Sequence, residues 1–263
     1  MQIGLFGGTG RMGRANIQAI IQDEEISLGS VQARATSSLM GCDAGELAGL
    51  GKLDVFVTAS LDPQAVDVVI DFTLPKTLSA NLEWCIKHQK PIVIGTTGLD
   101  DSQMQQIRDA AQQIPVVWAA NMSVGINLLL NLVKQASEVL GDTADIEIIE
   151  AHHRHKIDAP SGTAVVLGKA VADALDRDLS KCAVYGREGN TGEREQDTIG
   201  FATVRGGDVV GDHTVLFADD GERVELTHKA SSRLTFAKGA VRAAKWLSRQ
   251  SAGLYGMNDV LGF

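Results

Sequence analysis

Five basic or titratable side chains stand in a row near the middle of the sequence: His152, His153, Arg154, His155 and Lys156. Imidazoles titrate near neutral pH, so a histidine can both bind a carboxylate and release a proton. The lysine and arginine add positive charge beside them. The cluster therefore predicts a small acidic substrate and an acid–base step.

Two predicted elements would position this cluster. Residues 145–151 alternate apolar and polar side chains, which indicates a half-buried strand. Pro160-Ser161-Gly162-Thr163 then breaks the chain before a helix predicted over 164–175, with Ser161 or Thr163 as its N-cap. A helix N-terminus presents unpaired N–H groups and partial positive charge, so this end suits an anion.

Two other interpretations of the cluster stay open. One alternative is a solvated basic loop after a strand. The other is a metal site built from His152, His153 and His155. No HExxH motif or matching carboxylate spacing accompanies these histidines. We therefore expect no metal. We also expect a catalytic role in place of a solvated loop, because five basic or titratable residues next to a helix that starts at a glycine are more than solubility requires.

A second motif lies at the N-terminus. The apolar strand predicted over 3–6 runs into a glycine-rich turn, and a helix follows. This context predicts a dinucleotide-binding turn, in which glycines let the backbone approach a pyrophosphate at the helix N-terminus. The residues expected to bind the cofactor there are Gly7, Gly8, Thr9, Gly10, Arg11 and Met12.

The end of the second predicted strand, 26–33, bears on the choice of cofactor. NAD enzymes usually hold an acidic residue about twenty positions after the glycines, to bind the ribose diol. Here the sequence reads Gln32-Ala33-Arg34, without a carboxylate. Arg34 is placed to pair with a 2′-phosphate, so we predict that NADPH is preferred over NADH. The alternative is that Arg34 is a solvated loop charge.

The order of predicted elements indicates an α/β protein with two domains. Strands and helices alternate up to residue 123, as in a Rossmann-like parallel sheet, whereas short strands dominate after residue 183 and predict a smaller α+β domain with a mixed sheet. We expect residues 1–123 plus 234–263 to form the dinucleotide-binding domain. Residues 124–233 would form the domain for substrate binding and oligomerisation.

The segments EAHHRHK at 150–156 and DAPSGTA at 158–164 resemble the signature of 4-hydroxy-tetrahydrodipicolinate reductases (dihydrodipicolinate reductases). The resemblance extends over nearly the whole chain in motif order and length. It implies NAD(P)H-dependent reduction of the dihydrodipicolinate-type intermediate to tetrahydrodipicolinate, on the diaminopimelate route to lysine. It also implies a homotetramer assembled through the second domain.

The resemblance and the chemistry of the reduction together imply roles for individual residues. His152 would be the principal general acid, with Lys156 as electrostatic partner and alternative donor. His153, Gly162, Thr163 and Arg233 would bind the substrate. Segments matching the family's GTT and AAN motifs would contact the nicotinamide half of the cofactor: Gly95, Thr96, Thr97, Ala119, Ala120, Asn121 and Met122.

Composition excludes several other classes of protein. The chain has 263 residues, 44% of them hydrophobic, and a formal net charge of −9, which argues against nucleic-acid and anionic-membrane partners. Its three cysteines are widely spaced, as in reduced cytoplasmic proteins, and we expect a cytoplasmic location. The alternatives that remain are another NADP-linked reductase of small dicarboxylates, or a non-enzymatic nucleotide sensor.

Overall fold

The computed structural model describes residues 1–263, and its contacts divide the chain into two compact units. The first unit comprises Met1–Val124 and Arg233–Phe263, and the second comprises Gly125–Ser232. None of the helices is long and apolar enough to cross a membrane.

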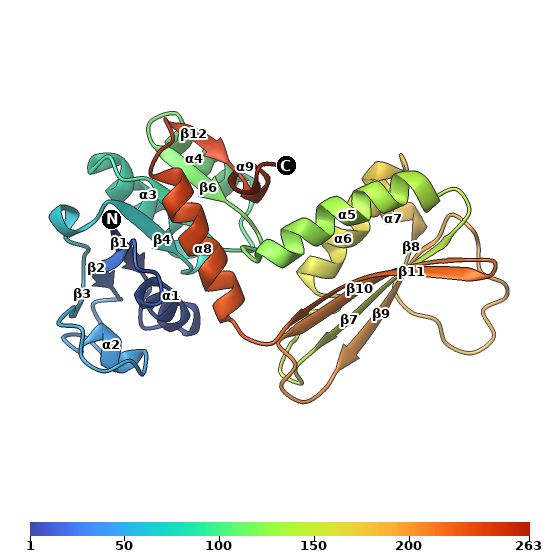
Figure 1. Cartoon of the computed structure of the whole chain (residues 1–263), viewed down its shortest axis with the longest axis horizontal. Coiled ribbons are helices and arrows are strands. Elements are labelled where there is room, and N and C mark those ends of the chain that lie inside the picture. Colours follow the sequence, from blue (N-terminus) through green and yellow to red (C-terminus); the bar gives the residue numbers. More distant parts are fainter. The chain divides into compact units, whose positions relative to one another are not determined.

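The first unit is built on a seven-stranded sheet in the order β12-β6-β5-β4-β1-β2-β3, in which every pair is parallel (Figure 1). Its strands are β1 (Gln2–Phe6), β2 (Ser27–Gln32), β3 (Val57–Thr58), β4 (Val68–Asp71), β5 (Ile92–Ile94), β6 (Pro115–Trp118) and β12 (Gly253–Tyr255). All four residues of β4 are buried, as expected for a central strand covered on both faces. Because the strands are parallel, their carboxyl ends share one edge.

Helices cover both faces of this sheet. They are α1 (Arg11–Ile21), α2 (Ala44–Leu47), α3 (Leu78–Lys87), α4 (Asp101–Ala111), α8 (Leu234–Leu247) and α9 (Met257–Leu261), with short 3-10 turns at Pro63–Ala65 and Pro75–Thr77. One core layer joins the sheet to α1, α8 and α9, and the other joins it to α3 and α4. The C-terminal segment therefore completes the N-terminal fold.

One short helix, α2, lies within the glycine-rich segment 41–51. Asp43 is the N-cap of α2, and its carboxylate accepts hydrogen bonds from the backbone of Gly45 and Glu46, and also of Leu53 and Asp54. One buried aspartate thus organises the whole segment, a long-range effect that local composition does not reveal.

The second unit is a five-stranded mixed sheet in the order β11-β10-β7-β9-β8 (Figure 1). Its elements are α5 (Val124–Leu140), β7 (Asp145–His152), α6 (Gly162–Ala174), α7 (Leu179–Cys182), β8 (Ala183–Val184), β9 (Ile199–Arg205), β10 (Gly211–Asp219) and β11 (Glu222–Ala230). Strands β7, β9 and β8 run parallel to one another, whereas β10 is antiparallel to β7 and β11 is antiparallel to β10. Helices α5 and α6 pack on one face of this sheet.

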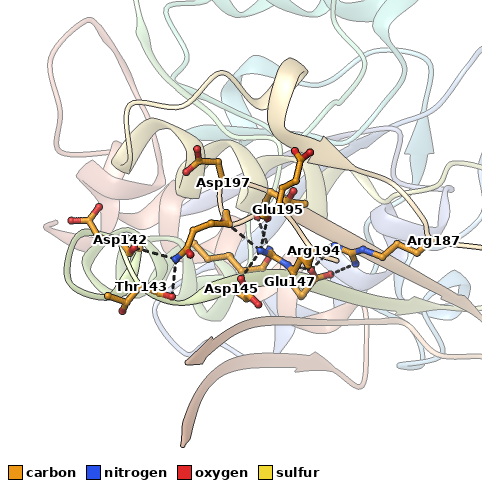
Figure 2. Close-up of polar contacts among 12 residues, drawn as sticks. Asp142, Thr143, Asp145, Glu147, Arg187, Arg194, Glu195 and Asp197 are labelled. Atoms are coloured by element: carbon orange, nitrogen blue, oxygen red, sulfur yellow. Dashed lines mark hydrogen bonds and ion pairs between the residues drawn. The ribbon is translucent and has the colours of Figure 1, made fainter. Parts of the chain in front are cut away.

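Ion pairs fix the polar loop 185–198 to strand β7 (Figure 2). The Arg194 guanidinium lies 2.6 Å from Oδ1 of Asp145 and 3.0 Å from Oε1 of Glu147. Arg187 binds both carboxylate oxygens of the same Glu147, at 2.9 and 3.0 Å. Glu147 therefore serves this loop, from the face of β7 opposite to the helices.

Candidate active site

Strand β7 and helix α6 place the basic cluster. The residues of β7 that face the helices are Ile146, Ile148, Glu150 and His152, so this face is apolar in its first half and polar at its end. The predicted strand is confirmed and extends one residue further, to His152. A turn then leads to Ser161, the N-cap of α6, whose hydroxyl accepts a hydrogen bond from the amide of Ala164 at 3.1 Å.

The carboxylate of Glu150 is the centre of the buried part of the site. Only 1% of this residue is exposed. Oε2 accepts from Nδ1 of His152 at 2.6 Å and from Nη1 of Arg205 at 2.8 Å. Oε1 accepts from Nη2 of Arg205 at 2.8 Å, from the amide of Ser161 at 3.0 Å and from Thr203 Oγ1 at 3.3 Å. Burial opposes ionisation, but these donors lower the pKa of Glu150 to about 2.

His152 is held by one ring nitrogen. The residue is 8% exposed, and its Nδ1 is committed to Glu150. Burial lowers the pKa of His152 below its ordinary value; the positive charges of Lys156 and Arg205 act in the same direction, whereas the Glu150 carboxylate opposes them. The ring is therefore fixed in orientation and releases a proton readily.

A second histidine packs against this ring. The ring of His213, on β10, meets that of His152 edge to face, with centroids 5.0 Å apart. Nε2 of His213 lies 2.9 Å from the hydroxyl of Ser161. Burial, with the neighbouring His152, lowers the pKa of His213 to about 4, so His213 is neutral at physiological pH. The buried hydrogen bond to Ser161 is consistent with a structural role for His213.

The remaining residues of the cluster are less buried. Lys156 forms an ion pair with Asp158, with Nζ 2.7 Å from Oδ1. The rings of His153 and His155 are 6.1 Å apart, and Nδ1 of His153 is buried without a hydrogen-bond partner. Nowhere in the chain do three or more His, Cys, Asp or Glu side chains converge so that they could hold a metal ion.

The N-terminus of α6 is open for a ligand. Gly162 is exposed, and a Cβ at this position would meet nothing within 4 Å. Thr163 is half-buried in the first turn. The Ser161 hydroxyl binds the amide of Ala164, and Gly162 has no side chain to cover the backbone. This end of the helix can therefore receive an anion from solvent.

A cavity of about 480 Å³ lies at the glycine-rich turn of the first unit. Gly7 has φ of +69°, which favours glycine, and Gly10 is an N-cap of α1 without a capping side chain. A Cβ at Gly8 would lie 2.2 Å from Val31, so the glycine also permits close packing of the turn on β2. The turn therefore fits a pyrophosphate on the first amides of α1.

The charges around this cavity are all positive. Arg11, Arg34 and Lys76 line it, and no carboxylate does. Arg34 and Arg11 are among the residues expected at the cofactor, together with Gly7, Thr9, Gly10 and Met12, which also line the cavity. Lys76 was not predicted, because it follows the fourth strand and lies far from the glycines in the sequence.

The expected nicotinamide-contacting segments follow β5 and β6 and do not line this cavity. Thr96 is 2% exposed, and its hydroxyl donates to the carbonyl of Thr73 at 3.4 Å. Met122 is 1% exposed and its side chain belongs to the core layer of α1 and α8. Any contact of Met122 with a ligand would therefore be through its backbone.

Arg233 lies at the N-cap of α8, in the first unit, whereas the histidines, Lys156 and Gly162 lie in the second. Neither Glu150 nor Arg205 was predicted from the sequence as a functional residue. The signal for Glu150 was present: it interrupts an apolar series on the buried face of a strand, where a carboxylate requires partners. Arg205 pairs with His152 in the β7–β9 register, which no local pattern reveals.

Comparisons with known proteins agree over nearly the whole chain. The family model described as dihydrodipicolinate reductase, N-terminus, matches residues 1–122, and the one described as dihydrodipicolinate reductase, C-terminus, matches residues 125–261. A 4-hydroxy-tetrahydrodipicolinate reductase from Pseudoalteromonas atlantica is 62% identical over 263 residues, covering 99% of this chain and 98% of that protein.

Solved structures show the same fold at lower identity. A dihydrodipicolinate reductase from Paenisporosarcina sp. TG-14, bound to dipicolinate, is 24% identical and superimposes with a TM-score of 0.76 over 98% of both chains. GenD2 of gentamicin A biosynthesis, in complex with NAD, is 15% identical, with a TM-score of 0.58 over 99% of this chain and 90% of that one.

Proposed function

The chain belongs to the dihydrodipicolinate reductase family, and from that premise we propose how its residues carry out the family's reaction. It is an oxidoreductase that uses a nicotinamide cofactor to reduce the dihydrodipicolinate-type intermediate to tetrahydrodipicolinate, on the diaminopimelate route to lysine. The observation that carries the mechanism is the hydrogen bond of 2.6 Å that Nδ1 of His152 donates to the buried carboxylate of Glu150.

His152 is the principal general acid in this mechanism. When bound, the reduced nicotinamide supplies a hydride to the conjugated C=C–C=N system of the substrate, and the substrate ring must then gain a proton. Because the pKa of His152 lies below its ordinary value, its imidazolium gives up a proton easily. The negative charge of a bound dicarboxylate would raise the pKa of His152, so that the imidazole is protonated when the substrate is bound.

Lys156 supports this step electrostatically. Reduction pushes electrons toward the ring nitrogen, and a nearby ammonium stabilises the negative charge that develops. The charge of Lys156 acts on His152, as the lowered pKa of that histidine indicates. Lys156 is also the alternative proton donor.

The substrate carboxylates bind mainly at the N-terminus of α6. The backbone at Gly162 is uncovered, and the Thr163 hydroxyl lies in the same first turn. His153 and Arg233 are further substrate contacts, a role that the family resemblance supports. Hydride transfer requires cofactor and substrate to meet, and we assign the cofactor to the first unit and the substrate to the second.

NADPH is the preferred cofactor, although NADH also fits the glycine-rich turn. The cavity there is lined by Arg11, Arg34 and Lys76 and by no carboxylate. A 2′-phosphate gains charge-assisted hydrogen bonds from such a set, whereas a ribose diol finds no acidic acceptor. Gly95, Thr96, Thr97, Ala119, Ala120, Asn121 and Met122 are assigned to the nicotinamide half.

The enzyme is a homotetramer assembled through the second unit's sheet. The face of this sheet opposite to α5 and α6 has no covering helix, and Ile149 and Val204 are 39% and 52% exposed there. Such apolar surface on a sheet face favours burial against another copy. The cytoplasmic location expected from the composition stays a prediction.

The test of this function is NADPH oxidation with freshly generated substrate, compared with a panel of other small dicarboxylates and aldehydes. The account predicts rapid oxidation only with the dihydrodipicolinate-pathway intermediate. Faster turnover of another member of the panel would assign the chain to a different reductase. Cofactor binding without any turnover would assign it to a nucleotide sensor.

A further inference from the structure

We propose that Glu150 is the positioning residue of the proton donor, fixing the His152 imidazole so that only Nε2 transfers the proton. The proposal rests on the proposed function, in which His152 is the general acid. It is carried by the contacts of the Glu150 carboxylate, which reach the donor, the guanidinium of Arg205 and the N-cap of α6.

The first step is the tautomer of His152. The Glu150 carboxylate is an acceptor only, because Arg205 binds both of its oxygens at 2.8 Å and keeps it ionised. The ring nitrogen 2.6 Å from Oε2 must therefore carry the hydrogen. In the neutral ring this leaves Nε2 with its lone pair, and in the charged ring Nε2 holds the proton that can leave.

The second step is access to Nε2. A Cβ at Gly211, on the neighbouring strand β10, would lie 3.0 Å from this atom. That is tighter than an ordinary van der Waals contact, so the absence of a side chain at Gly211 keeps the Nε2 edge uncrowded.

The third step links the donor to the anion site. The same Glu150 carboxylate accepts a hydrogen bond from the amide of Ser161 at 3.0 Å, and Ser161 is the N-cap of α6. One carboxylate therefore fixes the proton donor and the start of the helix that receives the substrate carboxylate. The guanidinium of Arg205 extends this frame to the following turn, by donating to the carbonyl of Asp158 at 2.7 Å.

The titratable and charged groups that face His152 come from four elements. Glu150 lies on β7, Arg205 on β9 and Lys156 in the turn after β7, and the ring of His213, neutral at physiological pH, packs from β10. Glu150 is the only negative charge among them and favours the charged imidazole, whereas the positive charges of Lys156 and Arg205 disfavour it. A glutamine at this position keeps an oxygen that can accept from the Ser161 amide but loses the negative charge, so Glu150→Gln should affect proton transfer more than substrate binding.

The variant that tests the proposal is Glu150→Gln, with Glu147→Gln as a matched control on the opposite face of the same strand. Glu150→Gln should lower kcat by about 100-fold, the size of a general-acid contribution, with a much smaller change in KM. The limb of the pH–rate profile on which activity falls with rising pH should move to lower pH. Glu147→Gln should leave both the profile and kcat unchanged.

A spectroscopic readout keeps the proposal testable if Glu150→Gln does not fold. In ¹⁵N-histidine-labelled wild-type enzyme, with the signals of residue 152 assigned by difference from His152→Gln, neutral His152 should be protonated at Nδ1. Protonation at Nε2 would overturn the proposal, as would an unchanged pH profile in Glu150→Gln. If His152→Gln itself keeps full activity, the proposed mechanism fails instead, whatever Glu150 does.

Discussion

The ammonium of Lys156 contacts both carboxylate oxygens of Asp158, at 2.7 and 2.8 Å. The cation expected to assist the substrate is thus already paired, with a carboxylate whose side chain is 54% exposed. The Lys156 contact lowers the pKa of Asp158, so the pair persists at neutral pH. A substrate carboxylate or a developing anion has to compete with Asp158 for Lys156.

This competition predicts opposite effects for the two partners. Lys156→Ala should reduce turnover by at least about 10-fold, because it removes a charge that stabilises the transition state. Asp158→Asn should lower the substrate KM by up to about 5-fold, the range for release of one exposed ion pair. Steady-state kinetics of both variants measures this. Unchanged turnover in Lys156→Ala would remove Lys156 from the mechanism.

The positive lining of the cofactor cavity predicts the effect of Arg34→Ala. The ratio of kcat/KM with NADPH to that with NADH should fall by about 10-fold, as for loss of a hydrogen bond to a charged group. Lys76→Ala should act in the same direction if its ammonium reaches the 2′-phosphate. The matched control is Lys87→Ala, which changes a lysine outside the cavity. A ratio that does not move in Arg34→Ala would make that arginine a solvated loop charge.

The open first turn of α6 predicts a binding effect for Thr163→Val. Removal of one hydroxyl should raise the substrate KM by about 3- to 10-fold and leave kcat nearly unchanged, as for an interaction made equally in ground and transition states. Thr227→Val, on the outer strand β11, removes a threonine hydroxyl elsewhere in the same unit. If Thr163→Val leaves KM untouched, the carboxylate is bound elsewhere.

The neutral state of buried His213 predicts how stability depends on pH. Its pKa is about 4 in the fold and 6.5 ordinarily, so the unfolded chain binds more protons between these values. Titration of His213 therefore leaves the free energy of unfolding unchanged above pH 6.5 and lowers it by about 3 kcal/mol as pH falls toward 4. His213→Asn should flatten the dependence over this window, measured by urea unfolding and circular dichroism.

An internal control for that experiment is tryptophan fluorescence. The three tryptophans, Trp84, Trp118 and Trp246, all lie in the first unit, so their signal follows the part of the chain that lacks His213. Carboxylates with lowered pKa values, such as Glu150, lose their contribution to the free energy of unfolding only below about pH 4.5. Their titration therefore does not overlap the upper part of the pH window. A dependence between pH 6.5 and 5 that is equal in wild type and His213→Asn would contradict the assignment.

The sequence predicted well what depends on local pattern. The alternation over 145–151 and the glycine turn after residue 6 gave β7 and the β1–α1 turn, because periodicity and φ preference act over a few residues. Ser161, one of two expected N-caps, is the cap. The parallel sheet, the mixed second sheet and the family were also predicted correctly.

What the sequence did not reveal depends on pairing between distant strands. Arg205 reaches Glu150 because β9 pairs with β7, and His213 lies opposite Glu150 on β10. The register of such pairs is set by the whole sheet, so the partners of a buried carboxylate are invisible in a local window. The ion pair of Lys156 with Asp158 was not predicted either. The two residues are close in sequence, but the position of Asp158 depends on the turn that Arg205 holds by its hydrogen bond to the Asp158 carbonyl.

The central claim, that His152 gives up the proton in the reduction, is tested most directly by the turnover of His152→Gln with freshly generated substrate. NADPH oxidation by this variant should fall at least about 100-fold below wild type, while the cofactor Kd stays within about twofold. Full turnover by His152→Gln with normal cofactor binding would contradict the account.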